Sequence, residues 1–207
     1  MSYIISSSEE TALQAHLHKL RTQLHEDPEL SWQEHRTTRL VRRELEALCL
    51  EPVPLGLPTG TAALLRGALP GPTVGLRADL DALPITERTG AEFSSRVPGV
   101  MHACGHDIHM AALLGAARLL AARREQLAGN VLFLFQPAEE AATGAMQVLE
   151  QGLFRRVPMA GMLALHVWPG LAQGQLGIRS GAILSAVDSF EITVTGRGGH
   201  GSAPERA

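Results

Sequence analysis

The sequence predicts an α/β fold built around a largely parallel sheet, and two observations lead to this prediction. Segments with helical periodicity alternate with short apolar runs along most of the chain, as in sheets whose strands are joined by helical crossovers. Cysteine, histidine and acidic motifs follow these apolar runs closely. Ligand sites in such sheets gather at the carboxyl ends of strands, so the positions of the polar motifs agree with the predicted fold.

Two helices are expected at the N-terminal end. A capping-box pattern at residues 7–10 precedes leucines at helical spacing, and this helix should end near Asp27-Pro28. Ser31 and Glu34 repeat the start signal, and the second helix should end before Pro52.

Further strands and helices are expected between Pro52 and Pro169. The apolar runs at residues 62–65, 73–78, 131–135 and 162–167 predict strands, and residues 109–124 and 141–151 predict helices. Residues 189–195 alternate between apolar and polar side chains, which predicts a half-solvated strand. Since a lone strand is not a domain, we expect a second domain to begin near Ser185.

Composition excludes several classes of protein. The formal net charge of −3 gives no basis for binding nucleic acid or an anionic membrane. The longest nearly apolar stretch, residues 111–122, is too short to span a bilayer, and the N-terminus lacks the pattern of a secretory signal. Cys49 and Cys104 are too few for a disulfide scaffold. A cytoplasmic protein with free thiols is therefore expected.

Cys104, Gly105 and His106 form the first candidate metal motif. Thiolate and imidazole both bind zinc and neighbouring transition metals, and the intervening glycine lets the backbone turn so that both face one site. Taken alone, such a motif is more often a buried cysteine beside an unrelated histidine.

Glu139 and Glu140 stand where a strand becomes a helix. Adjacent side chains on a strand point in opposite directions, so one carboxylate can bind a metal while the other acts as a general base on water. The alternative is a pair of acids in a first helical turn, stabilised by the helix macrodipole.

Several other polar residues are candidates for supporting roles. His166 ends an apolar strand, where it is either a ligand or a hydrogen-bonded core histidine. Asp79 and Asp107 are expected to orient ligand histidines, although each could instead cap a turn or a helix. His200 follows two glycines and could polarise a substrate carbonyl or simply form a turn. Asp81, like Asp79, could orient a ligand histidine or cap a turn. His102 and His109 either support the site or are exposed. The histidines of the N-terminal helices are expected at the surface or in packing contacts: His16, His18, His25 and His35.

As a set, the motifs resemble the M20 metallopeptidases, and within them the amidohydrolase branch of hippurate hydrolases, N-acyl-amino-acid amidohydrolases and auxin-conjugate hydrolases. The resembling stretches are residues 24–30, 76–84, 101–107, 136–140 and 198–200, in family order over nearly the whole chain.

The resemblance implies a site for two divalent ions, with Mn, Zn, Co and Ni all compatible. The ligands it implies are Cys104, His106, Glu140 and His166. Glu139 would be the general base, and His200 would be a lid histidine that acts across a homodimer.

The resemblance also implies a three-layer α/β/α zinc-exopeptidase domain. Residues 1–184 would be the N-terminal part of this catalytic domain, and residues 185–207 the first strand and Gly-Gly-His loop of a smaller α+β lid and dimerisation domain. Family members continue past this point and supply one more histidine ligand, so we expect the chain to be a fragment.

The expected reaction is metal-dependent hydrolysis of the amide bond of hippurate-like N-acyl amino acids, which releases a carboxylic acid and an amino acid. Two alternatives stay open: an aminopeptidase or dipeptidase with the same metals, and a truncated metal-binding remnant without turnover. The expected partners are a small N-acylated substrate and a second copy of the chain, with neither nucleic acid nor membrane.

Overall fold

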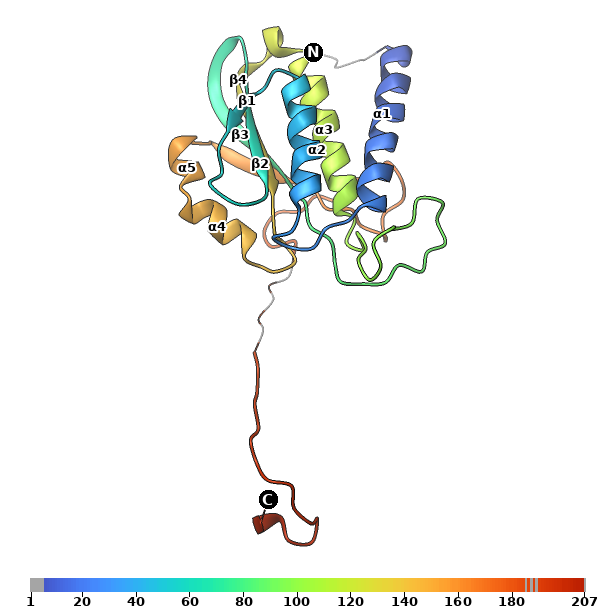
Figure 1. Ribbon diagram of the computed structural model, residues 1–207. Coiled ribbons are helices and arrows are strands. Elements are labelled where there is room, and N and C mark those ends of the chain that lie inside the picture. The colour runs from blue at the N-terminus through green and yellow to red at the C-terminus, as the bar shows by residue number, and fades with distance from the viewer. Residues whose placement is uncertain (1–5, 185, 187, 189, 207) are drawn as a thin grey trace. The chain divides into compact units, whose positions relative to one another are not determined.

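A five-stranded sheet runs through the larger part of the chain (Figure 1). Its strands lie in the order β1-β2-β4-β3-β5, with β3, β4 and β5 parallel and β1 and β2 antiparallel to their neighbours. The strands are β1 (Glu51–Val53), β2 (Thr61–Arg66), β3 (Leu69–Asp79), β4 (Ala128–Gln136) and β5 (Gly161–Ala164). The predicted α/β fold is confirmed. The sheet is mixed, with two parallel and two antiparallel pairings, where a largely parallel sheet was predicted.

The computed structural model describes residues 6–184, 186, 188 and 190–206. The chain divides into two compact units, residues 1–167 and residues 168–207. The first unit contains the sheet and every α-helix of the described residues. No helix in the described ranges has both the length and the apolar character needed to cross a bilayer.

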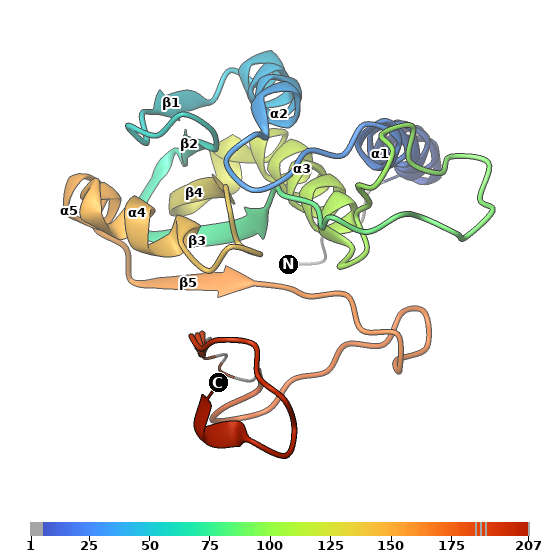
Figure 2. The ribbon, with the colours of Figure 1, turned by 60° about the horizontal axis from the view of Figure 1, so that its bottom comes forward.

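Helices cover both faces of the sheet. Figures 1 and 2 show α1 (Ser7–Glu26), α2 (His35–Ala47) and α3 (His106–Ala121) on one face, and α4 (Gly144–Glu150) and α5 (Leu153–Arg156) on the other. Each face has its own apolar core: Phe133 and Phe135 pack toward α1, α2 and α3, whereas Leu132 and Leu134 pack toward α4 and α5. This alternation along β4 produces the three-layer architecture. Two short 3-10 helices, η1 (Arg124–Gln126) and η2 (Pro204–Arg206), complete the described elements.

The parallel pairing aligns the strand ends that carry the polar motifs. Asp79 at the end of β3 pairs with Gln136 at the end of β4, and Arg77 pairs with Ala164 at the end of β5. The residues that follow these strands therefore meet at one edge of the sheet, as expected for the ligand site of a parallel sheet.

Some predicted helix starts were wrong, and local contacts explain the differences. Ser6, one residue before the predicted position, caps α1 by a reciprocal exchange of hydrogen bonds with Glu9. The helix predicted at residues 141–151 begins only at Gly144, because Ala138 and Ala142 adopt left-handed φ angles of +50° and +54°. The third helix begins three residues before its predicted start, directly after Gly105.

The strand predicted at residues 189–195 is not formed in the described part of this segment. Ser189 lies outside the described residues, and residues 190–195 are irregular, with Phe190, Ile192 and Val194 exposed. A strand is stabilised by hydrogen bonds to a neighbour, and no described strand pairs with residues 190–195. The division of the chain into domains at residue 185 stays a prediction, and the compact units divide at Val167.

Candidate metal centre

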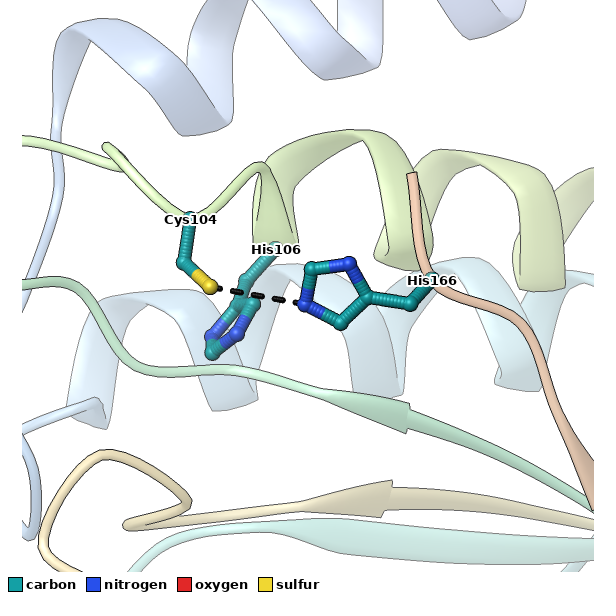
Figure 3. Close-up of side chains that lie close together, drawn as sticks. All are labelled: Cys104, His106 and His166. Atoms are coloured by element: carbon teal, nitrogen blue, oxygen red, sulfur yellow. Dashed lines mark hydrogen bonds between the residues drawn. The ribbon is translucent and has the colours of Figure 1, made fainter. Parts of the chain in front are cut away.

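Three side chains from two separate parts of the sequence converge at the edge of the sheet. Cys104 precedes α3, His106 lies in the first turn of α3, and His166 follows β5. Their ligand atoms all lie within 4.8 Å of one another. Figure 3 shows Cys104 and His166 pointing toward each other beside His106, with 3.4 Å between Cys104 Sγ and His166 Nε2.

Backbone carbonyls orient the two histidine rings. His106 Nδ1 donates to the carbonyl oxygen of Asp81 at 2.8 Å, and His166 Nδ1 donates to the carbonyl oxygen of Val167 at 2.7 Å. Because a carbonyl can only accept, Nδ1 carries the hydrogen in both rings. Each Nε2 atom is therefore directed into the site, as in metal-bound histidines whose other nitrogen is hydrogen-bonded.

Two buried acceptors face each other without a protein partner. His106 Nε2 and Glu140 Oε1 are 3.7 Å apart, and neither has a hydrogen-bond partner among the described residues. Buried polar atoms normally have partners. A cation between these atoms would satisfy both, and the donor set of thiolate, imidazole and carboxylate suits zinc and neighbouring transition metals.

The electrostatics of the site also favour a cation. Burial raises the pKa of the Cys104 thiol to about 12, and nearby Glu140 adds to the effect. Burial opposes a charge on His106, but Asp81 and Asp79 outweigh it and raise the pKa of that ring to about 9. The surplus of carboxylates thus draws protons onto the neighbouring groups, and a bound dication would supply this positive charge instead.

Glu139 and Glu140 differ in exposure, as their predicted division of labour requires. The side chain of Glu139 is 40% exposed and that of Glu140 is 19% exposed. Glu139 Oε2 lies 3.8 Å from His106 Nε2. This difference is compatible with a ligand and a general base, and the two roles stay predictions.

Asp79 supports the site through His109, and its Oδ2 atom also lies 3.7 Å from Nε2 of the candidate ligand His106. Asp79 Oδ1 accepts from His109 Nδ1 at 2.7 Å, and Arg77 Nη1 contacts Asp79 Oδ2 at 2.8 Å. Burial acts against ionisation, but these cationic and hydrogen-bonding partners hold the pKa of Asp79 far below its usual range. Because the carboxylate is already occupied and the guanidinium repels a cation, Asp79 and His109 are poorly placed as ligands.

His109 links α3 to the strand end that carries His166. Its Nε2 accepts from the backbone N–H of Val167 at 3.0 Å. Sequence reasoning left His109 open between a supporting and an exposed role, and the structure shows it buried. Its spacing of three residues from His106 on a helix places both rings on one face, which is the signal that identifies it.

Asp81 connects three parts of the site, a role that sequence reasoning left undecided. Its carboxylate accepts from the backbone N–H groups of Glu139 and Glu140 at 3.0 and 2.9 Å, and from Ser31 Oγ at 2.7 Å. Its own carbonyl oxygen accepts from His106. One residue thus positions both the glutamates and a histidine.

Asp107 contacts α1 rather than a candidate metal ligand, and His200 lies in the second unit. The Asp107 carboxylate is buried and accepts from Arg21 Nε at 2.7 Å and His25 Nδ1 at 2.9 Å, both from α1. The hydrogen bond to Asp107 raises the pKa of His25, a buried ring in this contact between helices. His200 lies in the second unit, where Nδ1 is 2.8 Å from Ser202 Oγ. The lid role of His200 stays a prediction.

Comparison with known proteins identifies relatives over most of the chain. A family model described as peptidase family M20/M25/M40 matches residues 75–205. An N-acetylcysteine deacetylase of Bacillus subtilis is 45% identical over 95% of this chain and 51% of its own length. An N-acyl-L-amino acid amidohydrolase of Geobacillus stearothermophilus is 42% identical over 90% of this chain and 50% of its own length.

A solved structure agrees in fold as well as in sequence. The crystal structure of a dinuclear metal-binding M20 peptidase from Bacillus subtilis matches with a TM-score of 0.75 and 46% identity, over 78% of this chain and 45% of that one. The chain spans about half the length of the curated relatives that it matches. On the family match, the sequence identities and the shared fold, the chain belongs to peptidase family M20/M25/M40.

Proposed function

We propose that this chain forms the metal-binding part of an amidohydrolase that cleaves the amide bond of N-acyl amino acids. The observation that carries the proposal is the pair of unpartnered buried acceptors, His106 Nε2 and Glu140 Oε1, beside Cys104 and His166. The names of two relatives, a deacetylase of N-acetylcysteine and an N-acyl-L-amino acid amidohydrolase, support the substrate class.

The four proposed ligands would hold two divalent ions. These ligands are Cys104, His106, Glu140 and His166. When bound, such ions lower the pKa of water and polarise the acyl carbonyl. The description of one related structure as a dinuclear metal-binding peptidase supports two ions.

Glu139 would act first as a general base and then as a general acid. Its partly exposed carboxylate would accept a proton from the attacking water, whose oxygen bonds to the acyl carbon. The same proton would then pass to the leaving amine as the C–N bond breaks, which yields a carboxylic acid and an amino acid. His200 would donate a hydrogen bond to the developing oxyanion, from a partner copy in a homodimer.

The test is a hydrolysis assay of the full-length protein with added Mn, Zn, Co or Ni. Hippurate and N-acetyl amino acids should be cleaved faster than dipeptides with a free amino terminus. Glu139→Gln should reduce kcat by about 10²- to 10⁴-fold while metal binding is retained. Glu150→Gln, a change at an exposed glutamate of α4, should leave kcat unchanged. A preference for free dipeptides would favour a peptidase, and full activity of Glu139→Gln would contradict its role as the base.

A further inference from the structure

Glu34 is a fully buried carboxylate that lies outside the proposed set of ligands. Its relative exposure is 0%. Oε1 accepts from the backbone N–H of Ala138 at 2.8 Å, and Oε2 accepts from Thr59 Oγ1 at 2.7 Å. Burying a carboxyl group is unfavourable unless hydrogen bonds compensate, so the bonds to Ala138 and Thr59 are what allow this group to be buried.

The loop that Glu34 holds has an unusual conformation. Ala138 has a left-handed φ angle of +50°, which is unfavourable for a residue with a Cβ atom. The next two N–H groups, those of Glu139 and Glu140, are both held by Asp81. Three consecutive N–H groups are thus fixed by two buried carboxylates, and Glu34 holds the one at the strained residue.

The segment around Glu34 contacts the same loop at additional points. Trp32 Nε1 donates to Thr143 Oγ1 at 3.0 Å, just beyond the glutamate pair. Ser31 Oγ donates to Asp81, which binds the N–H groups of that pair. The sequence suggested that Ser31 and Glu34 start a helix, but α2 begins without a side-chain cap. Both side chains are directed to the site instead.

We propose that Glu34 is a positioning residue that fixes the backbone of residues 137–140 and so places Glu139 and Glu140 for metal binding and proton transfer. The positioning itself is argued from the hydrogen bond to Ala138. Its effect on metal binding and proton transfer rests on the proposed function. Without that bond, Ala138 can relax toward ordinary φ values, and the side chains that follow it change direction.

The first measurement is hydrogen–deuterium exchange without metal. In the wild type, the amides of residues 138–140 should be protected although they lie in an irregular loop, and Glu34→Ala should accelerate their exchange. Glu34→Gln should restore protection, since its amide oxygen can accept from Ala138 and its amide group can pair with Thr59. Glu29→Ala is the matched control, because the Glu29 carboxylate binds Thr37 at the start of α2.

The second measurement is the Kd for Co²⁺, below the unfolding temperature of each variant. Glu34→Ala should raise the Kd by about 10- to 100-fold, the usual effect of removing a group that supports a metal ligand. Glu34→Gln should recover most of the affinity, and Glu29→Ala should bind as the wild type does.

The outcomes separate this inference from the proposed function. Failure of the wild type to bind Co²⁺ or to hydrolyse acylated substrates would count against the function, while the exchange data would still decide the role of Glu34. Unprotected amides at residues 138–140 in the wild type would overturn the inference even if Glu34→Ala does not fold. Equal exchange and equal Kd in Glu34→Ala and Glu29→Ala would overturn it as well.

Discussion

At the scale of single residues, two histidines that are similarly buried have pKa values shifted in opposite directions by their surroundings. His102 and His106 are both buried, and each has at least one ring nitrogen without a partner among the described residues. Burial lowers the pKa of His102 to about 4, so this ring stays neutral at physiological pH. The carboxylates around His106 raise its pKa instead. Of the two rings, only His106 lies in surroundings that attract a cation.

His109 provides a residue-scale prediction about the support of His166. His109→Phe removes the hydrogen bonds to Asp79 and to the N–H of Val167, so the strand end that carries His166 should lose its fixed position. The Kd for Co²⁺, measured by titration calorimetry, should rise by about 10- to 100-fold. His18→Phe, at an exposed position of α1, should not change it. Equal affinity in the two variants would contradict the supporting role.

At the scale of elements, the start of α3 determines how closely the strand end after β5 approaches. Gly105 has a φ angle of +81°, and a Cβ atom there would lie 2.5 Å from Val167 Cγ2. The glycine provides the turn that its place between Cys104 and His106 suggested, and it also permits the contact next to His166, which the sequence did not predict.

Gly105→Ala should therefore have two effects: a loss of stability from backbone strain, and weaker metal binding. A left-handed residue with a Cβ atom costs about 1–2 kcal/mol, and displacement of Val167 should in addition weaken Co²⁺ binding. Gly99→Ala is the matched control, since its φ angle is +76° and nothing lies within 4 Å of the added atom. Urea unfolding should show a lower free energy of unfolding in both variants, whereas the Kd for Co²⁺ should rise only in Gly105→Ala. Unchanged Co²⁺ affinity in Gly105→Ala would count against this account.

The three helices on one face of the sheet are joined through Glu44, and this contact should make stability depend on pH. Glu44 on α2 accepts from His16 on α1 and from Arg118 on α3, each at 2.9 Å. Burial alone would raise its pKa, but these two partners outweigh burial and lower the pKa below 4.5. A carboxyl with a lowered folded-state pKa stabilises the fold above its ordinary pKa. That contribution is lost as the pH falls through the folded-state value.

Glu44→Gln should accordingly lower the free energy of unfolding at pH 7 by about 1 kcal/mol. The difference from the wild type should shrink as the pH is lowered below about 4.5, which urea unfolding at a series of pH values measures. Glu46→Gln, at an exposed position on the same helix, should cause no comparable change. If the difference between the two proteins grew as the pH fell, the pKa of Glu44 would be raised in the folded state and not lowered.

At the scale of the whole molecule, the sequence predicted the sheet and the convergence of the motifs, because both depend on local patterns. Apolar runs identify the strands, although β5 is mostly exposed where a buried strand was predicted. Parallel pairing then brings Asp79, the residues after Gln136 and the residues after Ala164 to one edge. This placement, together with the resemblance to the M20 metallopeptidases that supplied the ligand set, allowed the proposed ligands to be named before any contact was known.

What the sequence could not predict depends on contacts between distant residues. Ser31 and Glu34 have the local pattern of a helix start, yet their side chains bind Asp81 and Ala138. The left-handed Ala138 has no local signal, because its conformation is stabilised by a residue 104 positions away. The alternation at residues 190–195 was interpreted as a strand, although strand formation requires a partner that the pattern does not supply.

Metal binding should stabilise the first unit as a whole, because the ligands come from segments that the fold must bring together. An ion present at 100 times its Kd adds about 2.7 kcal/mol to stability if it binds only the folded state. Scanning calorimetry should show an increase in Tm with Zn²⁺ or Co²⁺ that is reversed by a chelator. His106→Ala should remove this increase, whereas an increase that persists in this variant would place the ion elsewhere.

The most direct test of the central claim is X-ray absorption spectroscopy of the zinc-loaded protein, because only one of the two cysteines, Cys104, is a proposed ligand. The account predicts a sulfur neighbour at about 2.3 Å together with nitrogen and oxygen neighbours at about 2.0–2.2 Å. The sulfur signal should persist in Cys49→Ala and disappear in Cys104→Ser. A spectrum without sulfur, or a sulfur signal that survives Cys104→Ser, would contradict the proposed metal centre.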